Sequence, residues 1–133
     1  HPKESHVIPS LIRRVVNKET PFKIWGNGED SRDFIYIDDF IEGVINATNL
    51  DEQFMDINLT TASNSTINEI LENIFEIENY YPDVIYDLSQ PQTIKKRLLN
   101  NDKAKSVIEF KINTTIKSGL EKTINWYREN EQN

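Results

Sequence analysis

The stretch WGNGEDSRDFIYIDDF, residues 25–40, decides the fold class that we predict from the sequence. Residues 26–28, Gly-Asn-Gly, are turn formers, and residues 33–37 are rich in side chains that favour β-structure. Just upstream, apolar and other side chains alternate through residues 22–25, a period of two that is typical of a strand. The stretch therefore predicts a hairpin-like pair of strands joined by a glycine-rich loop.

Apolar side chains recur at helical spacing on both sides of this hairpin. Asp38 or Asp39 can cap the helix that follows it, because a carboxylate accepts hydrogen bonds from the free N–H groups of a first turn. We interpret both as caps rather than acid/base residues. Thr66 and Glu69 form the S/T-x-x-E pattern of a capping box. The expected helices cover residues 7–17, 38–49, 66–77, 102–108 and 115–127.

Alternation of apolar residues predicts two further strands, at residues 54–59 and 84–86. Residues 89–100 should form a loop with a small extended piece. Short strands mixed with about five helices predict the α/β (α+β) class. A chain of 133 residues has the length of one domain, so we expect a single domain over residues 1–133.

Composition excludes several classes of function. The net charge of −7 disfavours a nucleic-acid partner, because phosphate contacts need clustered Lys and Arg. No apolar run approaches the roughly 18 residues of a membrane helix, and the first ten residues lack the apolar core of a signal peptide. With no cysteine there is neither a disulfide nor a thiolate metal site, which fits a reducing compartment. We therefore expect a cytoplasmic protein with no metal and no membrane partner.

The pattern W-G-x-G-x-x-x-R-D-F-x-x-x-D-D over residues 25–39 resembles the substrate-binding half of the extended short-chain dehydrogenase/reductases, the NAD-dependent epimerase/dehydratase family. Its members epimerise, reduce or dehydrate nucleotide-activated sugars. The opening stretch HPKESHVIPSLIRR, residues 1–14, narrows the resemblance to GDP-L-fucose synthase-like enzymes, and residues 115–130 extend it to nearly the whole chain. The resemblance implies the C-terminal portion of a longer enzyme that lacks its Rossmann half, and the only methionine, Met55, agrees with truncation.

His6 is the candidate catalytic residue, because an imidazole that titrates near neutral pH can give or take a proton. The alternative is a structural histidine that caps or packs. In the family that this chain resembles, the histidine of S-H-V-I-P acts as a general acid beside a ketone, and that motif is intact at residues 5–9. His1 matches the same stretch, but we assign it no role.

Four further residues are candidate substrate contacts, and three of them, Arg14, Trp25 and Arg32, lie in the first 32 residues. Arg32 carries a planar fork that can bind a diphosphate at two points; alternatively it is a surface arginine paired with Glu29 or Asp30. Trp25 lines the pocket in the family, although a tryptophan is more often part of a core. Arg14 matches a family arginine that reaches the nucleotide, or it is an exposed cation near a helix C-terminus, where the dipole favours it.

The chain departs from GDP-fucose synthases at residues 89–100. The family's aspartate position holds Gln92, so recognition of guanine is in doubt, whereas Lys95, with Lys96 or Arg97, can still meet phosphate. The family's Y-x-x-x-K pair is missing, as is any G-x-G-x-x-G fingerprint. We therefore expect NAD or NADP to bind the missing N-terminal half, and no cofactor to bind this chain alone.

These observations lead to one main hypothesis. The chain is the substrate-binding half of an NAD(P)-dependent nucleotide-sugar epimerase/reductase or dehydratase that acts on a 4-keto sugar nucleotide, and it is inactive alone. Its partners would be a nucleotide-diphosphate sugar and the missing Rossmann domain, in a parent that the family resemblance makes a homodimer. The alternatives are a stand-alone nucleotide-sugar or protein binding module without catalysis, and a structural fragment that self-associates through an apolar surface.

Overall fold

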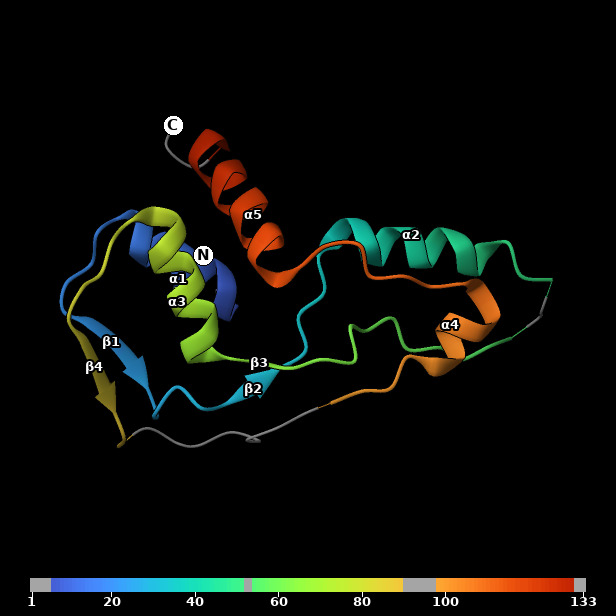
Figure 1. Ribbon diagram of the computed structural model, residues 1–133, viewed down its shortest axis with the longest axis horizontal. Helices are drawn as coiled ribbons and strands as arrows, with labels where there is room; N and C mark the ends of the chain where they lie inside the picture. The colour runs from blue at the N-terminus through green and yellow to red at the C-terminus, as the bar shows by residue number, and fades with distance from the viewer. Residues whose placement is uncertain (1–5, 52–53, 90–97, 131–133) are drawn as a thin grey trace.

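The computed structural model describes residues 6–51, 54–89 and 98–130. Both helices and short strands occur along them, which confirms the predicted mixed α/β class (Figure 1). The helices are α1 (Val7–Val16), α2 (Ile37–Thr48), α3 (Ile67–Glu78), α4 (Asp102–Ile108) and α5 (Ile116–Asn130). The strands are β1 (Phe22–Trp25), β2 (Ser31–Arg32), β3 (Ser65–Thr66) and β4 (Val84–Asp87). All five helices lie where the sequence predicts them. No helix among the described residues is both long and apolar enough to cross a membrane.

The strands pair differently from the prediction. β1 pairs in parallel with β4, with Phe22 opposite Val84 and Trp25 opposite Asp87, while β2 pairs antiparallel with β3. The hairpin predicted between residues 22–25 and 33–37 is therefore wrong. A parallel pair needs a crossover connection, and the partner of β1 arrives only after α3. Residues 33–36 form no strand but an irregular connection that leads into α2.

The strand predicted at residues 54–59 is also wrong, since this segment has no regular secondary structure. Its alternating apolar side chains have a different use. Ile57 and Leu59 pack against a cluster of buried residues around α4, while Phe54 is 85% exposed. The alternation correctly indicated that one side of this segment is buried. It does not show whether a neighbouring strand is available to pair with the segment.

The starts of α2 and α3 lead to a third correction. The capping box of α3 is confirmed: the Thr66 hydroxyl accepts from the Glu69 N–H at 3.1 Å, and the Glu69 carboxylate accepts from the Thr66 N–H at 2.8 Å. α2, in contrast, begins at its N-cap Tyr36 without a side-chain cap. Asp38 and Asp39 are thus not caps but lie in the first turn, where negative charge suits the helix dipole.

The carboxylate of Asp39 has a different partner. It is buried and accepts hydrogen bonds from the Thr114 N–H at 3.0 Å and from the Thr114 hydroxyl at 3.2 Å. Asp39 therefore fastens α2 to the segment that leads into α5.

Two clusters of buried apolar side chains lie towards opposite ends of the molecule (Figure 1). The smaller cluster, beside α2 and α4, consists of Ala104, Ile108 and Phe110. The larger one joins α1, α3, α5 and β1, with the rings of Phe22 and Phe75 edge to face at 5.6 Å. Its members are Leu11, Ile12, Val15, Phe22, Ile24, Ile70, Leu71, Ile74, Phe75, Leu120 and Ile124.

Replacing Ile124 by alanine should lower the free energy of unfolding by about 2–5 kcal/mol, because a fully buried side chain leaves a cavity when it is truncated. Ile45→Ala is the matched control, since the Ile45 side chain on α2 is 56% exposed whereas Ile124 is 0% exposed. The control should change stability by less than about 1 kcal/mol. Urea unfolding followed by circular dichroism measures both, and equal losses would contradict this description of the core.

Candidate functional site

The carboxyl ends of β1 and β4 meet at one edge of the parallel pair (Figure 1). Trp25 is the last residue of β1, and the next N–H, that of Gly26, donates to the Asp87 carbonyl at 2.8 Å. In open α/β sheets ligands bind outside the carboxyl ends of parallel strands. The chain leaves β1 here as the loop of residues 26–30, so this loop lies where such a ligand would bind.

Trp25 presents its ring to solvent at this edge. The residue is 75% exposed and lies on the side of β1 opposite the buried Phe22 and Ile24. The alternative of a core tryptophan is therefore excluded. An exposed indole offers a large, rigid aromatic face on which a base or a sugar ring can stack.

Arg32 lies at the far end of the same loop. It is half-buried in β2, opposite Ser65 of β3, and its Nη1 donates to the Ser31 carbonyl at 2.7 Å. Glu29, one of the acidic residues considered as its partner, accepts a hydrogen bond from Asn68 at 2.9 Å. Trp25 and Arg32 thus flank one loop of five residues.

His6 is the N-cap residue of α1. Its carbonyl accepts from the Ser10 N–H at 3.0 Å, and its exposed side chain makes no capping hydrogen bond to the helix. Arg14 lies eight residues further along the same helix, roughly 12 Å away at the usual rise per residue. A ligand that touches both would have to be extended, as a nucleotide-diphosphate sugar is.

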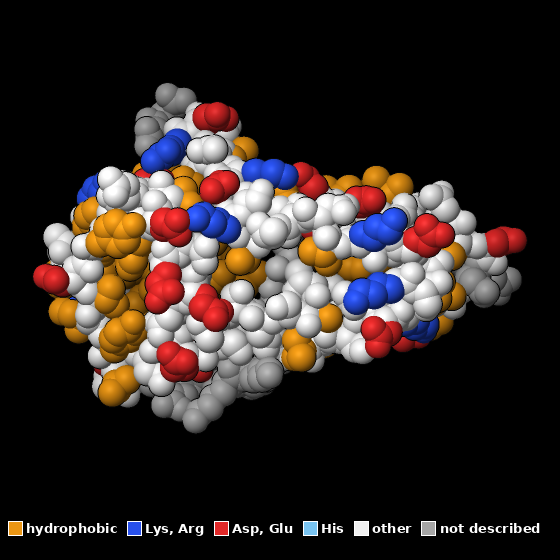
Figure 2. Space-filling view, viewed as in Figure 1, with side chains coloured by type: hydrophobic (Ala, Val, Ile, Leu, Met, Phe, Trp, Pro, Cys, Tyr) orange, Lys and Arg blue, Asp and Glu red, His pale blue; other side chains and the backbone are white. Residues whose placement is uncertain are grey.

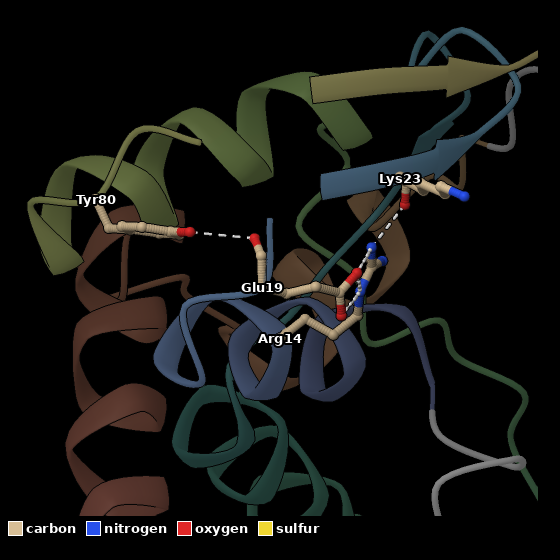
Figure 3. Close-up of polar contacts among 4 residues, drawn as sticks. All are labelled: Arg14, Glu19, Lys23 and Tyr80. Carbon is tan, nitrogen blue, oxygen red and sulfur yellow. Dashed lines mark hydrogen bonds and ion pairs between the residues drawn. The ribbon is translucent and has the colours of Figure 1, made fainter. Parts of the chain in front are cut away.

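Arg14 is already held by protein groups (Figure 3). Its Nη2 donates to a Glu19 carboxylate oxygen at 2.7 Å and to the Lys23 carbonyl at 2.7 Å, and its Nε donates to Glu19 at 3.0 Å. Its guanidinium lies 4.0 Å from the centre of the Phe22 ring. Arg14 therefore joins α1 to β1, and its role in binding a nucleotide stays a prediction.

Two adjoining pockets lie between the segment after Arg32 and the start of α5, and Figure 2 shows the hollow between the two ends of the molecule. The first, of about 300 Å³, is mostly apolar. The second, of about 240 Å³, is lined by the hydroxyl-bearing residues Thr61, Ser63, Ser65, Thr114 and Thr115 together with Phe34, Ile112 and Ile116. Among the described residues, neither lining includes His6, Trp25 or Arg32.

Two residues of the predicted site, Lys95 and Gln92, cannot be placed, and two residues that the sequence did not indicate lie near the loop. Lys95 and Gln92 lie outside the described residues. No group of three or more His, Cys, Asp or Glu side chains that could hold a metal occurs within residues 6–51, 54–89 and 98–130. Sequence reasoning missed Asn68, which contacts the loop of residues 26–30 because α3 packs beside it, and Tyr86 of β4, which contacts Asn68.

Comparison with known proteins tests the predicted family resemblance. Residues 1–60 match the model of the NAD dependent epimerase/dehydratase family. A rice (Oryza sativa subsp. japonica) protein named "Probable GDP-L-fucose synthase 1" is 30% identical over 98% of this chain and 40% of its own length. The GDP-L-fucose synthase of Escherichia coli is 27% identical over 98% of this chain and 44% of its own length. The predicted resemblance to this family of nucleotide-sugar enzymes is therefore confirmed.

The fold is also similar to that of a solved nucleotide-sugar enzyme. The crystal structure of UDP-glucose 4-epimerase from Thermotoga maritima with UDP-glucose superposes with a TM-score of 0.85 and 25% identity, over 95% of this chain and 40% of that one. The chain thus spans about two fifths of the length of the proteins it matches.

Glu19→Gln should lower stability at pH 7 by less than about 1 kcal/mol, because the exposed pair with Arg14 is screened by solvent. The hydrogen bond from Arg14 holds the pKa of Glu19 below its ordinary value, which is about 4.3. The contribution of the ionised carboxylate is therefore present above that value and lost as the pH falls through the lowered pKa.

The difference in unfolding free energy between wild type and Glu19→Gln should consequently shrink as the pH falls from 7 through the lowered pKa of Glu19. Urea unfolding at pH 7, 4 and 2 measures it. A difference that stays constant across this series would contradict the ion pair.

Proposed function

We propose that this chain is the substrate-binding portion of an NAD(P)-dependent nucleotide-sugar epimerase, reductase or dehydratase that acts on a 4-keto sugar nucleotide. The observation that carries the proposal is the placement of Trp25 and Arg32 on either side of one loop, at the carboxyl edge of the parallel strands. The relatives named GDP-L-fucose synthase and UDP-glucose 4-epimerase support a nucleotide sugar as the ligand. The identity of the nucleotide is left open because residue 92 is Gln.

Each residue would have a distinct role. The guanidinium of Arg32 would donate two charge-assisted hydrogen bonds to the diphosphate, and the exposed ring of Trp25 would stack on the base or the sugar. His6 would return a proton to the carbon beside the ketone, on the face opposite the one from which a base removed it. That base, and the tyrosine and lysine of the family's Y-x-x-x-K pair, would come from outside this chain.

The nicotinamide cofactor does not fit the residues present here. The loop with Gly26 and Gly28 joins strand β1 to strand β2, whereas a dinucleotide fingerprint joins a strand to a helix whose N-terminus receives the pyrophosphate. We therefore assign NAD or NADP to a Rossmann portion outside this chain, where it would supply hydride transfer. No step of the chemistry assigned to this chain uses it.

Helix α2 supports such a missing partner. Its buried residues are Asp39 and Gly43, whereas its apolar stripe faces outwards, the reverse of an ordinary surface helix. A Cβ on Gly43 would meet Leu59 and Phe110 at 2.8 Å, so the polar side of the helix is packed closely against the chain. The outward stripe consists of Ile37, Phe40, Ile41, Val44 and Ile45, each at least 40% exposed.

We infer that the Rossmann portion covers this stripe in the parent enzyme, because exposed apolar patches of this kind mark interaction surfaces. The stripe also argues against a stand-alone binding module, which would have no use for it. A cytoplasmic location and a homodimeric parent belong to the same proposal.

Arg32→Ala should weaken binding of a nucleotide sugar by about 10–100-fold, because charge-assisted hydrogen bonds to the diphosphate are lost. NMR titration of the labelled chain with GDP-L-fucose and, separately, with UDP-glucose measures the dissociation constants even when binding is weak. Arg13→Ala removes the same charge from α1 and should change them by no more than about twofold. Equal losses in the two variants, or no binding of either probe by the wild type, would refute the assignment.

The isolated chain should be catalytically inactive with NADPH and a 4-keto sugar nucleotide. In the full-length parent, read from the source gene upstream of the codon for His1, His6→Gln should lower epimerisation by about 10²-fold or more, the usual contribution of a general acid. Nucleotide-sugar affinity should be unchanged, which separates proton transfer from binding. Turnover by the isolated chain, or full activity of the variant, would contradict the proposal.

A further inference from the structure

The loop of residues 26–30 connects two separate sheets. Trp25 ends β1, whose partner is β4, while Arg32 lies in β2, whose partner is β3. Strand pairing alone therefore does not fix the position of the indole relative to the guanidinium. The conformation of the loop that joins them, together with the packing of α3, sets this position.

Asn68, in the first turn of α3, holds this loop by three hydrogen bonds. Its side-chain Nδ2 donates to the Asn27 carbonyl at 3.2 Å and to the Glu29 carboxylate at 2.9 Å. Its backbone N–H donates to the Gly28 carbonyl at 3.1 Å. One residue thus contacts three consecutive residues of the loop.

Tyr86 of β4 fixes the orientation of the Asn68 amide. Its hydroxyl donates to Oδ1 of Asn68 at 3.0 Å, which leaves both Nδ2 hydrogens facing the loop. The amide group then uses its acceptor and both donors within the protein. Asn68 consequently links the loop to α3 and to β4 at the same time.

Gly28 is the residue that makes this contact possible. Its φ is +76°, and a Cβ built there would lie 1.9 Å from Oδ1 of Asn68. Any larger side chain would displace the Asn68 amide and would also strain the backbone. The second glycine of the W-G-x-G pattern therefore has a packing reason that is distinct from phosphate binding.

We propose that Asn68 is a positioning residue for the ligand site, because it fixes the loop that sets Trp25 and Arg32 relative to each other. This inference rests on the proposed function, since it concerns how that same site is held for a nucleotide sugar. Asn68 does not touch the ligand. It acts through the loop, with Tyr86 as the group that orients its amide.

The test uses Asn68→Ala in the isotope-labelled chain. ¹⁵N relaxation should show lower order parameters for the amides of residues 26–30, and the dissociation constant for the better of GDP-L-fucose and UDP-glucose should rise about tenfold. Asn68→Asp keeps the size and the acceptor but loses both donors, so it should behave like Asn68→Ala. Asn73→Ala is the matched control: Asn73 lies on the same helix and, among the described residues, donates within that helix, to the Glu69 carbonyl at 2.7 Å.

Three further variants test whether Asn68 acts by positioning the loop or through a general loss of stability. Gly28→Ala should reproduce the loosened loop and the weaker binding, and Tyr86→Phe should do so to a smaller extent. In an Arg32→Ala background, Asn68→Ala should cost less than its full tenfold loss, because the part of its effect that acts through Arg32 is already gone and the two effects are not additive. Thermal unfolding of each variant shows that the fold is retained.

The outcomes are distinguishable. Wild-type binding with an unchanged dissociation constant in Asn68→Ala, an unchanged loop, or a full tenfold loss in the Arg32→Ala background would overturn this inference alone. A wild-type chain that binds neither probe would overturn the proposed function, and the inference would fall with it. Loss of loop order together with weaker binding, absent in Asn73→Ala, supports both.

Discussion

The parallel pairing of β1 with β4 is the constraint on which the rest of the structure depends. Parallel neighbours cannot be joined by a tight turn, so the chain must travel through α3 before β4 can form. That crossover brings α3 against α1 and α5 around the larger core. It also places the ends of both strands at one edge, where the loop of residues 26–30 begins and the Asp87 carbonyl receives the Gly26 N–H.

What the sequence could predict follows from how far apart the interacting residues lie. The helices and the capping box of Thr66 and Glu69 depend on residues three or four positions apart, so periodicity and short patterns were enough to find them. The strand pairing failed because Phe22 pairs with Val84, more than sixty positions away. Asn68 was missed for the same reason: nothing near it in the chain indicates that Gly28 and Tyr86 will surround it.

Prediction of the candidate site from the sequence was limited in the same way. The W-G-x-G-x-x-x-R pattern drew attention to Trp25 and Arg32, and the structure places both beside one loop. The pattern could not tell an exposed tryptophan from a buried one, because strand polarity and the position of the covering helices decide that. Nor could the opening stretch of residues 1–14 show that Glu19 and Lys23 already bind the guanidinium of Arg14, since these contacts require the chain to turn between α1 and β1.

The unequal size of the two cores has a consequence for how the molecule opens. Local unfolding costs least where few apolar side chains are buried. Among the described residues, the cluster at the end with α2 and α4 has three buried members, against eleven in the larger cluster. That end should therefore exchange its amide hydrogens fastest and unfold first while the larger core stays intact. The apolar stripe of α2 lies at this end and is also the surface that we assign to the Rossmann portion. Binding of the Rossmann portion would therefore order the end with α2 and α4 and raise its stability by mass action. Folding of the weaker end and assembly of the enzyme would then be one coupled equilibrium.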